Sequence, residues 1–118
     1  MFRIGYGIDY HQMKEGREFW LGGIQIPFHK GSLGHSDADV LLHAICDAML
    51  GALALGDIGT HFPDTDNTYK NIDSKILLKN CYYLIQEKGY TIGNIDSTVC
   101  LQNPKLKPYI LEMQQAIA

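Results

Sequence analysis

A stripe of apolar residues at helical spacing constrains the fold of this chain more than any other feature. The stripe recurs every three or four positions, through Val40, Leu41, Ala44, Ile45, Ala48, Met49, Ala52 and Leu53. Such spacing is typical of the buried face of an amphipathic helix. Ser36, followed three residues later by Asp39, resembles a capping box at its start, although Asp replaces the usual Glu or Gln. We expect this helix to end near Gly56.

Two further helices are predicted in the second half of the chain. Residues 73–88 have a helical period of apolar positions, and Gly89 supplies a C-terminal cap. Pro104 precedes a third apolar period that reaches Ile117. Residues 56–67, rich in Gly, Asp and Pro, indicate a polar loop with turns between the first two helices. A loop of this length in a small domain is often functional.

Strand patterns lie between the helices. Residues 2–10 and 91–101 are rich in β-branched and aromatic residues, and residues 18–26 predict two short strands joined at Gly22-Gly23. Helices combined with a few strands predict an α+β fold: a single domain over residues 1–118, with a small mixed β-sheet covered on one face by helices.

Composition argues against several classes of function. The net charge of −3 provides no broad basic surface, so we expect no nucleic-acid partner. We also expect no membrane association, because no stretch approaches the roughly 20 apolar residues that a spanning helix needs. The amino terminus lacks a secretion-signal pattern. Three cysteines, Cys46, Cys81 and Cys100, are an odd number without C-x-x-C spacing, which indicates reduced and mainly buried thiols in a cytosol-like compartment.

Asp9 and His11 form the first part of a candidate metal site. They lie two residues apart on a predicted strand, so both side chains point to the same face. His43 is the candidate third ligand, because it lies away from the centre of the apolar stripe. An Asp-His-His set with one open position suits catalytic Zn²⁺, although spacing alone also fits ordinary surface or packing residues. Asp39 or Asp47, each four residues from His43, could orient its ring or could be solvated charges.

Three further groups could bind a phosphorylated polyol. His35 and Ser36 precede the first predicted helix, where free backbone N–H groups favour phosphate, although a simple Ser36 cap explains part of this pattern. Lys105 follows Gln102-Asn103-Pro104 at another predicted helix start, where a surface lysine is the ordinary alternative. Carboxylates of the 56–67 loop could accept hydrogen bonds from hydroxyls or simply form turns: Asp57, Asp64 and Asp66.

In combination and in this order, the motifs resemble one family, the 2-C-methyl-D-erythritol 2,4-cyclodiphosphate synthases, from about Arg3 to the last residue. The matching segments are Gly7-Ile8-Asp9-Tyr10-His11, Leu21-Gly22-Gly23, His35-Ser36-Asp37-Ala38-Asp39-Val40, His43, Gly56-Asp57-Ile58-Gly59, Phe62-Pro63-Asp64-Thr65-Asp66 and Gln102-Asn103-Pro104-Lys105. The resemblance implies a metal-dependent phosphorus–oxygen lyase of the non-mevalonate (methylerythritol phosphate) pathway of isoprenoid precursor biosynthesis. Such an enzyme converts 4-diphosphocytidyl-2-C-methyl-D-erythritol 2-phosphate to 2-C-methyl-D-erythritol 2,4-cyclodiphosphate and releases CMP.

The resemblance also implies roles for individual residues. Asp9, His11 and His43 would bind one Zn²⁺ per subunit, and a second cation, Mg²⁺ or Mn²⁺, would bind the substrate diphosphate. His35 would be the catalytic residue, placed with Ser36 against the phosphate under attack. The implied substrate-binding positions are Asp9, Tyr10, His11, His35, Ser36, Asp57, Ile58, Gly59, Phe62, Pro63, Asp64, Thr65, Asp66, Leu101, Pro104, Lys105, Leu106 and Lys107.

Assembly and extent are further expectations from the resemblance. The family forms homotrimers with active sites between subunits, in which the segment at residues 102–107 receives the cytidine diphosphate part of a substrate bound to a neighbouring subunit. The family continues for roughly another strand and helix with a Thr-Thr-x-Glu segment, so we expect residues 1–118 to be a synthase domain that lacks this C-terminal part. We expect a bacterial cytoplasmic location, with a plastid-type organelle as the alternative.

Two other functions are compatible with the candidate ligands. A metal-binding domain without catalysis predicts a closed site, with Cys46 as a fourth ligand. A zinc hydrolase needs a carboxylate base near the open position, and Asp37 or Asp39 could serve. The loop at residues 56–66 and the Pro104-Lys105 pair distinguish these alternatives, because only a nucleotide-diphosphate substrate uses both.

Overall fold

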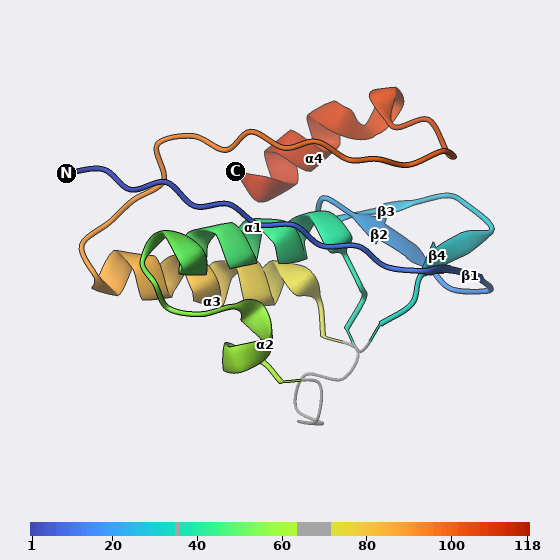
Figure 1. The fold of residues 1–118 in the computed structure, drawn as a ribbon. Coiled ribbons are helices and arrows are strands. Elements are labelled where there is room, and N and C mark those ends of the chain that lie inside the picture. Colours follow the sequence, from blue (N-terminus) through green and yellow to red (C-terminus); the bar gives the residue numbers. More distant parts are fainter. Residues whose placement is uncertain (35, 64–71) are drawn as a thin grey trace.

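Two helices packed side by side form the base of the molecule, and two extended segments cross above them (Figure 1). The computed structural model describes residues 1–34, 36–63 and 72–118. Its elements are β1 (Met13–Glu15), β2 (Phe19–Leu21), β3 (Ile24–Ile26), β4 (Lys30–Ser32), α1 (Val40–Ala52), α2 (Ile58–His61), α3 (Ser74–Glu87), the 3-10 helix η2 (Lys107–Tyr109) and α4 (Ile110–Ile117). None of the described helices is both long and apolar enough to cross a membrane.

The strands form two antiparallel pairs, β1 with β4 and β2 with β3. The β2–β3 hairpin confirms the prediction for residues 18–26, since Leu21 pairs with Ile24 across a turn at Gly22 and Gly23. Both glycines have positive φ, 64° and 83°, as a two-residue hairpin turn requires. The elements are those of an α+β domain, but the predicted single mixed sheet is wrong for the described residues, where the two pairs are separate.

Helix α1 confirms the first predicted helix but begins at a different cap. Asp39, not Ser36, is the N-cap residue, and its side chain accepts a hydrogen bond from the Leu42 N–H. The chain turns at Ala38, with φ of 58°, so helical geometry starts only after Asp39. The hydroxyl oxygen of Ser36 instead accepts from the Ala38 N–H. The helix ends at Ala52, before the expected end near Gly56.

The remaining helices largely follow the sequence pattern. Helix α3 confirms the predicted helix at 73–88, with Asp73 as its N-cap and Gly89, φ 85°, just beyond its end. The third apolar period forms η2 and α4 in succession. The predicted loop contains the short helix α2, capped by Asp57, and its part at residues 64–67 lies outside the described residues.

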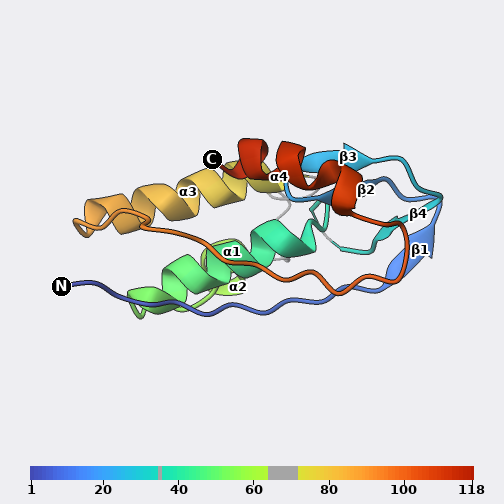
Figure 2. The same ribbon diagram turned by 90° about the horizontal axis from the view of Figure 1, so that it is seen from above.

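The core lies between α1, α3 and the β2–β3 hairpin, with α4 packed against the hairpin (Figure 2). Met113 of α4 contributes to this core beside Gly22. Its buried members are Phe19, Leu21, Ile26, Leu41, Leu42, Ile45, Cys46, Met49, Leu50, Leu77, Cys81, Ile85 and Met113. The free cysteines Cys46 and Cys81 are therefore packing residues, whereas Cys100 is exposed.

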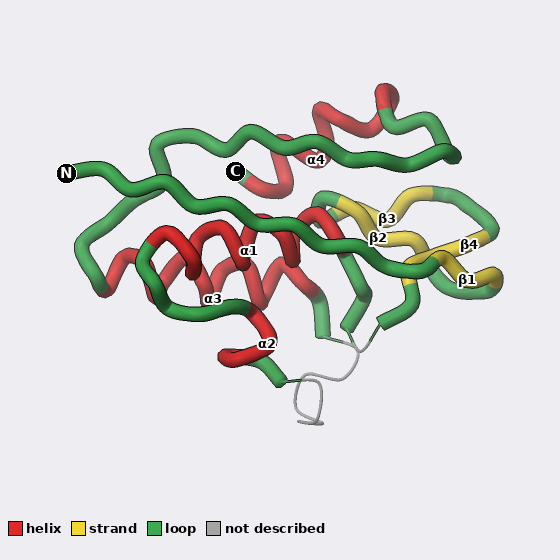
Figure 3. The backbone as a smooth tube through the Cα atoms, in the orientation of Figure 1, coloured by secondary structure: helices red, strands yellow, loops and turns green. Residues whose placement is uncertain are grey.

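The predicted strands at residues 2–10 and 91–101 are wrong as hydrogen-bonded strands. Both segments are extended and run in the same direction along the length of α1, but neither pairs with another strand among the described residues (Figures 1 and 3). The first segment still alternates in the manner of a strand. Its even-numbered side chains are exposed, and Gly5 and Gly7 lie against the backbone of α1.

Candidate metal centre

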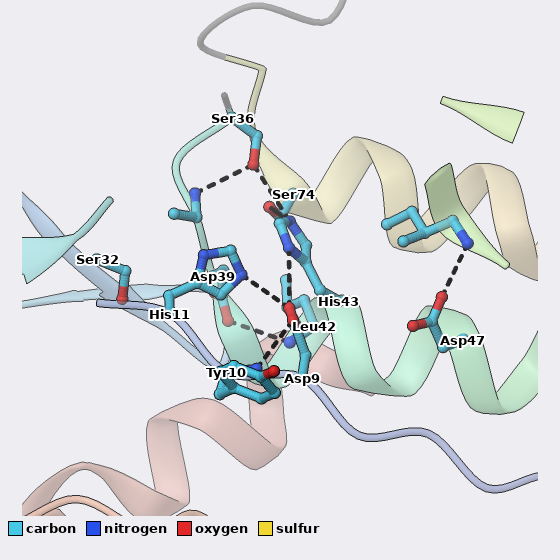
Figure 4. Close-up of polar contacts among 12 residues, drawn as sticks. Asp9, Tyr10, His11, Ser32, Ser36, Asp39, Leu42, His43, Asp47 and Ser74 are labelled. Carbon is cyan, nitrogen blue, oxygen red and sulfur yellow. Dashed lines mark hydrogen bonds and ion pairs between the residues drawn. The ribbon is translucent and has the colours of Figure 1, made fainter. Parts of the chain in front are cut away.

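Asp9, His11 and His43 meet where the N-terminal segment crosses the first turn of α1 (Figure 4). The Asp9 Oδ2 atom lies 2.8 Å from Nε2 of His11 and 3.4 Å from Nδ1 of His43. One potential ligand atom from each residue lies within 4.8 Å of the others. The convergence of Asp9 and His11 on one side follows from strand-like alternation, as the sequence pattern indicates.

The donor atoms fit a divalent transition metal. One carboxylate oxygen and two imidazole nitrogens form a ligand set that suits Zn²⁺ and leaves a position open in tetrahedral geometry. The Nδ1 atom of His11 lies 3.1 Å from the Leu33 carbonyl oxygen, which can only accept a hydrogen bond. Nδ1 of His11 therefore donates to Leu33, which leaves Nε2, the nitrogen that faces Asp9, to donate to the carboxylate when protonated or to bind a metal when unprotonated. All three side chains are partly exposed, so the site is accessible.

Electrostatics keep the Asp9 carboxylate ionised. Burial alone would raise its pKa, but hydrogen bonds and attraction from the protonated forms of His11 and His43 outweigh burial and lower the pKa below the ordinary value. The hydrogen bond to Asp9 in turn raises the pKa of His11, although burial opposes this rise. The ionised Asp9 carboxylate thus places negative charge on an oxygen that faces both imidazoles, where a bound cation would be stabilised.

The side chains that contact the second nitrogen of His43 differ from those predicted. Asp39 binds the backbone N–H groups of Gly22, Gly23 and Leu42, and Asp47 accepts from the N–H at residue 58. Both carboxylates are therefore occupied by backbone donors, so the prediction that one of them orients His43 is wrong.

Two hydroxyls occupy that place instead. The Nε2 atom of His43 lies 3.2 Å from Oγ of Ser36 and 2.9 Å from Oγ of Ser74 (Figure 4). Ser36 was a candidate from the sequence, but Ser74 was not. The sequence showed only that Ser74 lies at the start of a predicted helix, and that position does not indicate a contact with His43.

The implied substrate positions within the described residues divide into three groups. Ser36 lies beside the candidate ligands, whereas the Tyr10 side chain points outward and is 88% exposed, with its backbone N–H on Asp9 Oδ1. Helix α2 begins with Ile58 and Gly59 after its N-cap Asp57, and Phe62 and Pro63 follow it. The hydrogen bond from the Ile58 N–H to Asp47 ties α2 to α1. His35, Asp64, Thr65 and Asp66 lie outside the described residues.

The third group lies near His11. An open hollow of about 780 Å³ is lined by His11 and by the segment that contains Leu101, Pro104 and Lys105. Leu106 and Lys107 follow at the start of η2. One imidazole of the candidate metal site therefore borders both the ligand cluster and the segment expected to bind the nucleotide.

Gly7 controls how closely the N-terminal segment approaches α1. A Cβ at this position would lie 2.0 Å from the Ala44 carbonyl oxygen. Gly7→Ala should push the segment away and destabilise the protein by about 1–3 kcal/mol. Because Asp9 and His11 move with it, zinc affinity should fall by roughly tenfold or more. Chelator competition and urea unfolding measure the two effects.

Gly93→Ala is the matched control, since a Cβ at this position has nothing within 4 Å. Equal zinc affinities for the Gly7 and Gly93 variants would contradict the inferred role of this close contact.

Comparisons with known proteins place this chain in a defined class. The fold and site define a small α+β domain with a candidate Asp-His-His metal centre, and the model of the YgbB family matches residues 2–118. The chain belongs to the YgbB family. A Bacteroides fragilis relative named 2-C-methyl-D-erythritol 2,4-cyclodiphosphate synthase is 63% identical over 116 residues, which cover 98% of this chain and 73% of the relative. A relative of the same name from Geobacillus sp. is 56% identical over 118 residues, which cover 100% of this chain and 75% of the relative.

Solved structures agree with these relatives. A 2C-methyl-D-erythritol-2,4-cyclodiphosphate synthase matches with a TM-score of 0.84 and 38% identity, covering 98% of this chain and 77% of that one. The bifunctional IspDF of Campylobacter jejuni matches with a TM-score of 0.92 and 46% identity over 98% of this chain and 31% of its own. These comparisons confirm the predicted family, the α+β class and the cyclodiphosphate synthase role.

Proposed function

We propose that this protein converts 4-diphosphocytidyl-2-C-methyl-D-erythritol 2-phosphate to 2-C-methyl-D-erythritol 2,4-cyclodiphosphate and CMP, with a metal at Asp9, His11 and His43. The convergence of these three donor groups in one accessible site carries the proposal. The names of the relatives support the product, and one synthase structure of similar fold is described as a CDP-bound form, with a TM-score of 0.83 and 37% identity.

The site suits intramolecular phosphoryl transfer. The attacking 2-phosphate oxygen is already anionic, so the reaction needs positioning and charge stabilisation more than a general base. Zn²⁺, one per subunit, supplies Lewis-acid polarisation of a phosphoryl oxygen when bound. Asp9 and the two histidines hold it, and Ser36 beside His43 binds the phosphate group. We propose His35 as the catalytic hydrogen-bond donor to the developing charge.

The other contacts are proposals from the family resemblance. Residues 57–59 and 62–66 would bind the methylerythritol part, and Leu101 with residues 104–107 would bind the cytidine diphosphate part. A second divalent cation, Mg²⁺ or Mn²⁺, would accompany the diphosphate. We propose a single domain over residues 1–118 that assembles as a homotrimer with sites between subunits. The bacterial relatives support a cytoplasmic location.

The described geometry favours neither alternative function. Cys46 lies in the core, where its hydrogen bond with Cys81 and burial raise the pKa of its thiol, so the thiolate that zinc requires is disfavoured. Asp37 accepts hydrogen bonds from Ser74, and Asp39 is fully buried on backbone N–H groups. Neither carboxylate is available as the base of a zinc hydrolase.

Metal removal tests the proposed function. Dialysis against a zinc chelator should abolish CMP release from the substrate in the presence of Mg²⁺, and added Zn²⁺ should restore it. Size-exclusion chromatography with light scattering should show a trimer before and after. Full CMP release from protein shown to be zinc-free would contradict the metal-dependent mechanism.

A further inference from the structure

The two nitrogens of the His43 ring face different surroundings. Nδ1 points toward Asp9 and the candidate metal position, at 3.4 Å from Oδ2. Nε2 points the opposite way, toward the first turn of α3, where Oγ of Ser74 lies at 2.9 Å. A neutral imidazole carries one proton, so only one nitrogen can offer a lone pair to a metal. The partner of Nε2 therefore determines whether Nδ1 can bind a metal.

Asp37 determines what Ser74 can offer to His43. Its carboxylate accepts the Ser74 N–H at 3.0 Å and also accepts a hydrogen bond from the Ser74 hydroxyl. A serine hydroxyl has a single proton, and an ionised carboxylate can only accept hydrogen bonds. The proton of the Ser74 hydroxyl is thus committed to Asp37. Toward His43 its oxygen can act only as an acceptor.

We propose that Ser74, held by Asp37, is a positioning residue that fixes His43 as the Nε2–H tautomer and so directs the Nδ1 lone pair to the metal. The inference rests on the proposed metal function of His43. Ser74 is fully buried, so water does not compete for its oxygen. The Ser36 Oγ atom, which accepts from the Ala38 N–H, lies farther from the same nitrogen, at 3.2 Å, so Ser74 is the nearer partner.

The contact between Asp37 and Ser74 also has a structural role, which can be separated from the positioning of His43. The contact between Asp37 and the Ser74 backbone N–H anchors the start of α3 to the segment before α1, and it does not need the hydroxyl. Ser74→Ala keeps this anchor and removes only the acceptor for His43. A helix-anchoring role alone therefore predicts an unchanged ring, whereas a positioning role predicts a changed tautomer.

Nitrogen-15 NMR of the metal-free protein tests the tautomer directly. At a pH about two units above the ordinary histidine value of about 6.5, wild-type His43 should show a protonated Nε2 and an unprotonated Nδ1. Ser74→Ala should give a mixture of tautomers. Its zinc affinity, from chelator competition, should fall by about 10–100-fold, the usual effect of losing a hydrogen-bond partner of a metal ligand.

Ser32→Ala is the matched control, because it deletes another buried hydroxyl, whose partner is Met13 rather than His43. Ser74→Thr should restore the wild-type tautomer, because it retains the hydroxyl. A wild-type His43 protonated on Nδ1 would overturn the inference even if Ser74→Ala failed to fold. A folded Ser74→Ala protein with the wild-type tautomer and zinc affinity would also overturn the inference. Because the tautomer is measured without metal, failure of the proposed function is a separate result, seen as wild-type protein that binds no zinc.

Discussion

His43→Ala and Asp9→Ala are each expected to lose bound zinc and to reduce CMP release by about a hundredfold or more, while the fold survives. The activity loss is the size found when one charge-stabilising group is removed from an active site. Each substitution removes one of three converging donor atoms. Neither side chain belongs to the buried apolar core, so its truncation leaves the packing of α1 and α3 intact. Zinc content after dialysis, CMP release and circular dichroism measure the three properties.

His61→Ala is the control for the loss of an imidazole. His61 lies in α2, and its Nε2 donates to the Leu55 carbonyl rather than facing Asp9. This variant should keep its zinc. Folded, zinc-loaded and active variants at residues 9 and 43 would overturn the ligand assignment.

Asp39→Ala is expected to lower the free energy of unfolding by about 3 kcal/mol or more, without removing a candidate metal ligand. The fully buried Asp39 carboxylate accepts backbone N–H groups of Gly22, Gly23 and Leu42 at 3.0, 2.8 and 3.1 Å. Its removal leaves three donors without their partner, and each unsatisfied buried donor costs about 1–3 kcal/mol. The β2–β3 turn would also lose its link to the start of α1. Urea unfolding measures the change.

Asp73→Ala provides the comparison for Asp39. Asp73 is also an N-cap residue, but it is partly exposed, and it accepts the Lys75 N–H and forms a surface ion pair with the Lys75 ammonium at 3.3 Å. Its replacement should cost about 1 kcal/mol, the usual value for a helix cap. Equal losses for the two variants would show that Asp39 acts as an ordinary cap and not as a link between hairpin and helix.

Features that depend on neighbours in sequence were predictable. The turn at Gly22-Gly23 and the helix at 73–88 follow from local geometry and periodicity, and both are present. The meeting of Asp9 with His11 follows from two-residue alternation in an extended segment. His43 was predicted as the third candidate from its position beside the apolar stripe of its helix.

Features that depend on distant parts of the chain were not predictable from local patterns. Ser74 reaches His43 only because α1 and α3 pack side by side, and the sequence separation of 31 residues conceals this contact. Asp39 lies four residues from His43, a spacing that allows contact on a helix, yet its carboxylate accepts hydrogen bonds from backbone N–H groups of the hairpin instead. Residues 2–10 and 91–101 have strand composition, but a strand also needs a hydrogen-bonded neighbour, which composition cannot provide.

Phosphorus NMR of the reaction tests the central claim most directly. The full-length protein would be incubated with 4-diphosphocytidyl-2-C-methyl-D-erythritol 2-phosphate, Zn²⁺ and Mg²⁺, and the phosphorus signals followed with time. A metal-dependent cyclodiphosphate synthase predicts loss of the substrate signals and the appearance of CMP and a cyclic diphosphate in equal amounts. Zinc-loaded trimer that leaves the substrate unchanged, or that releases CMP without forming the cyclic product, would contradict it.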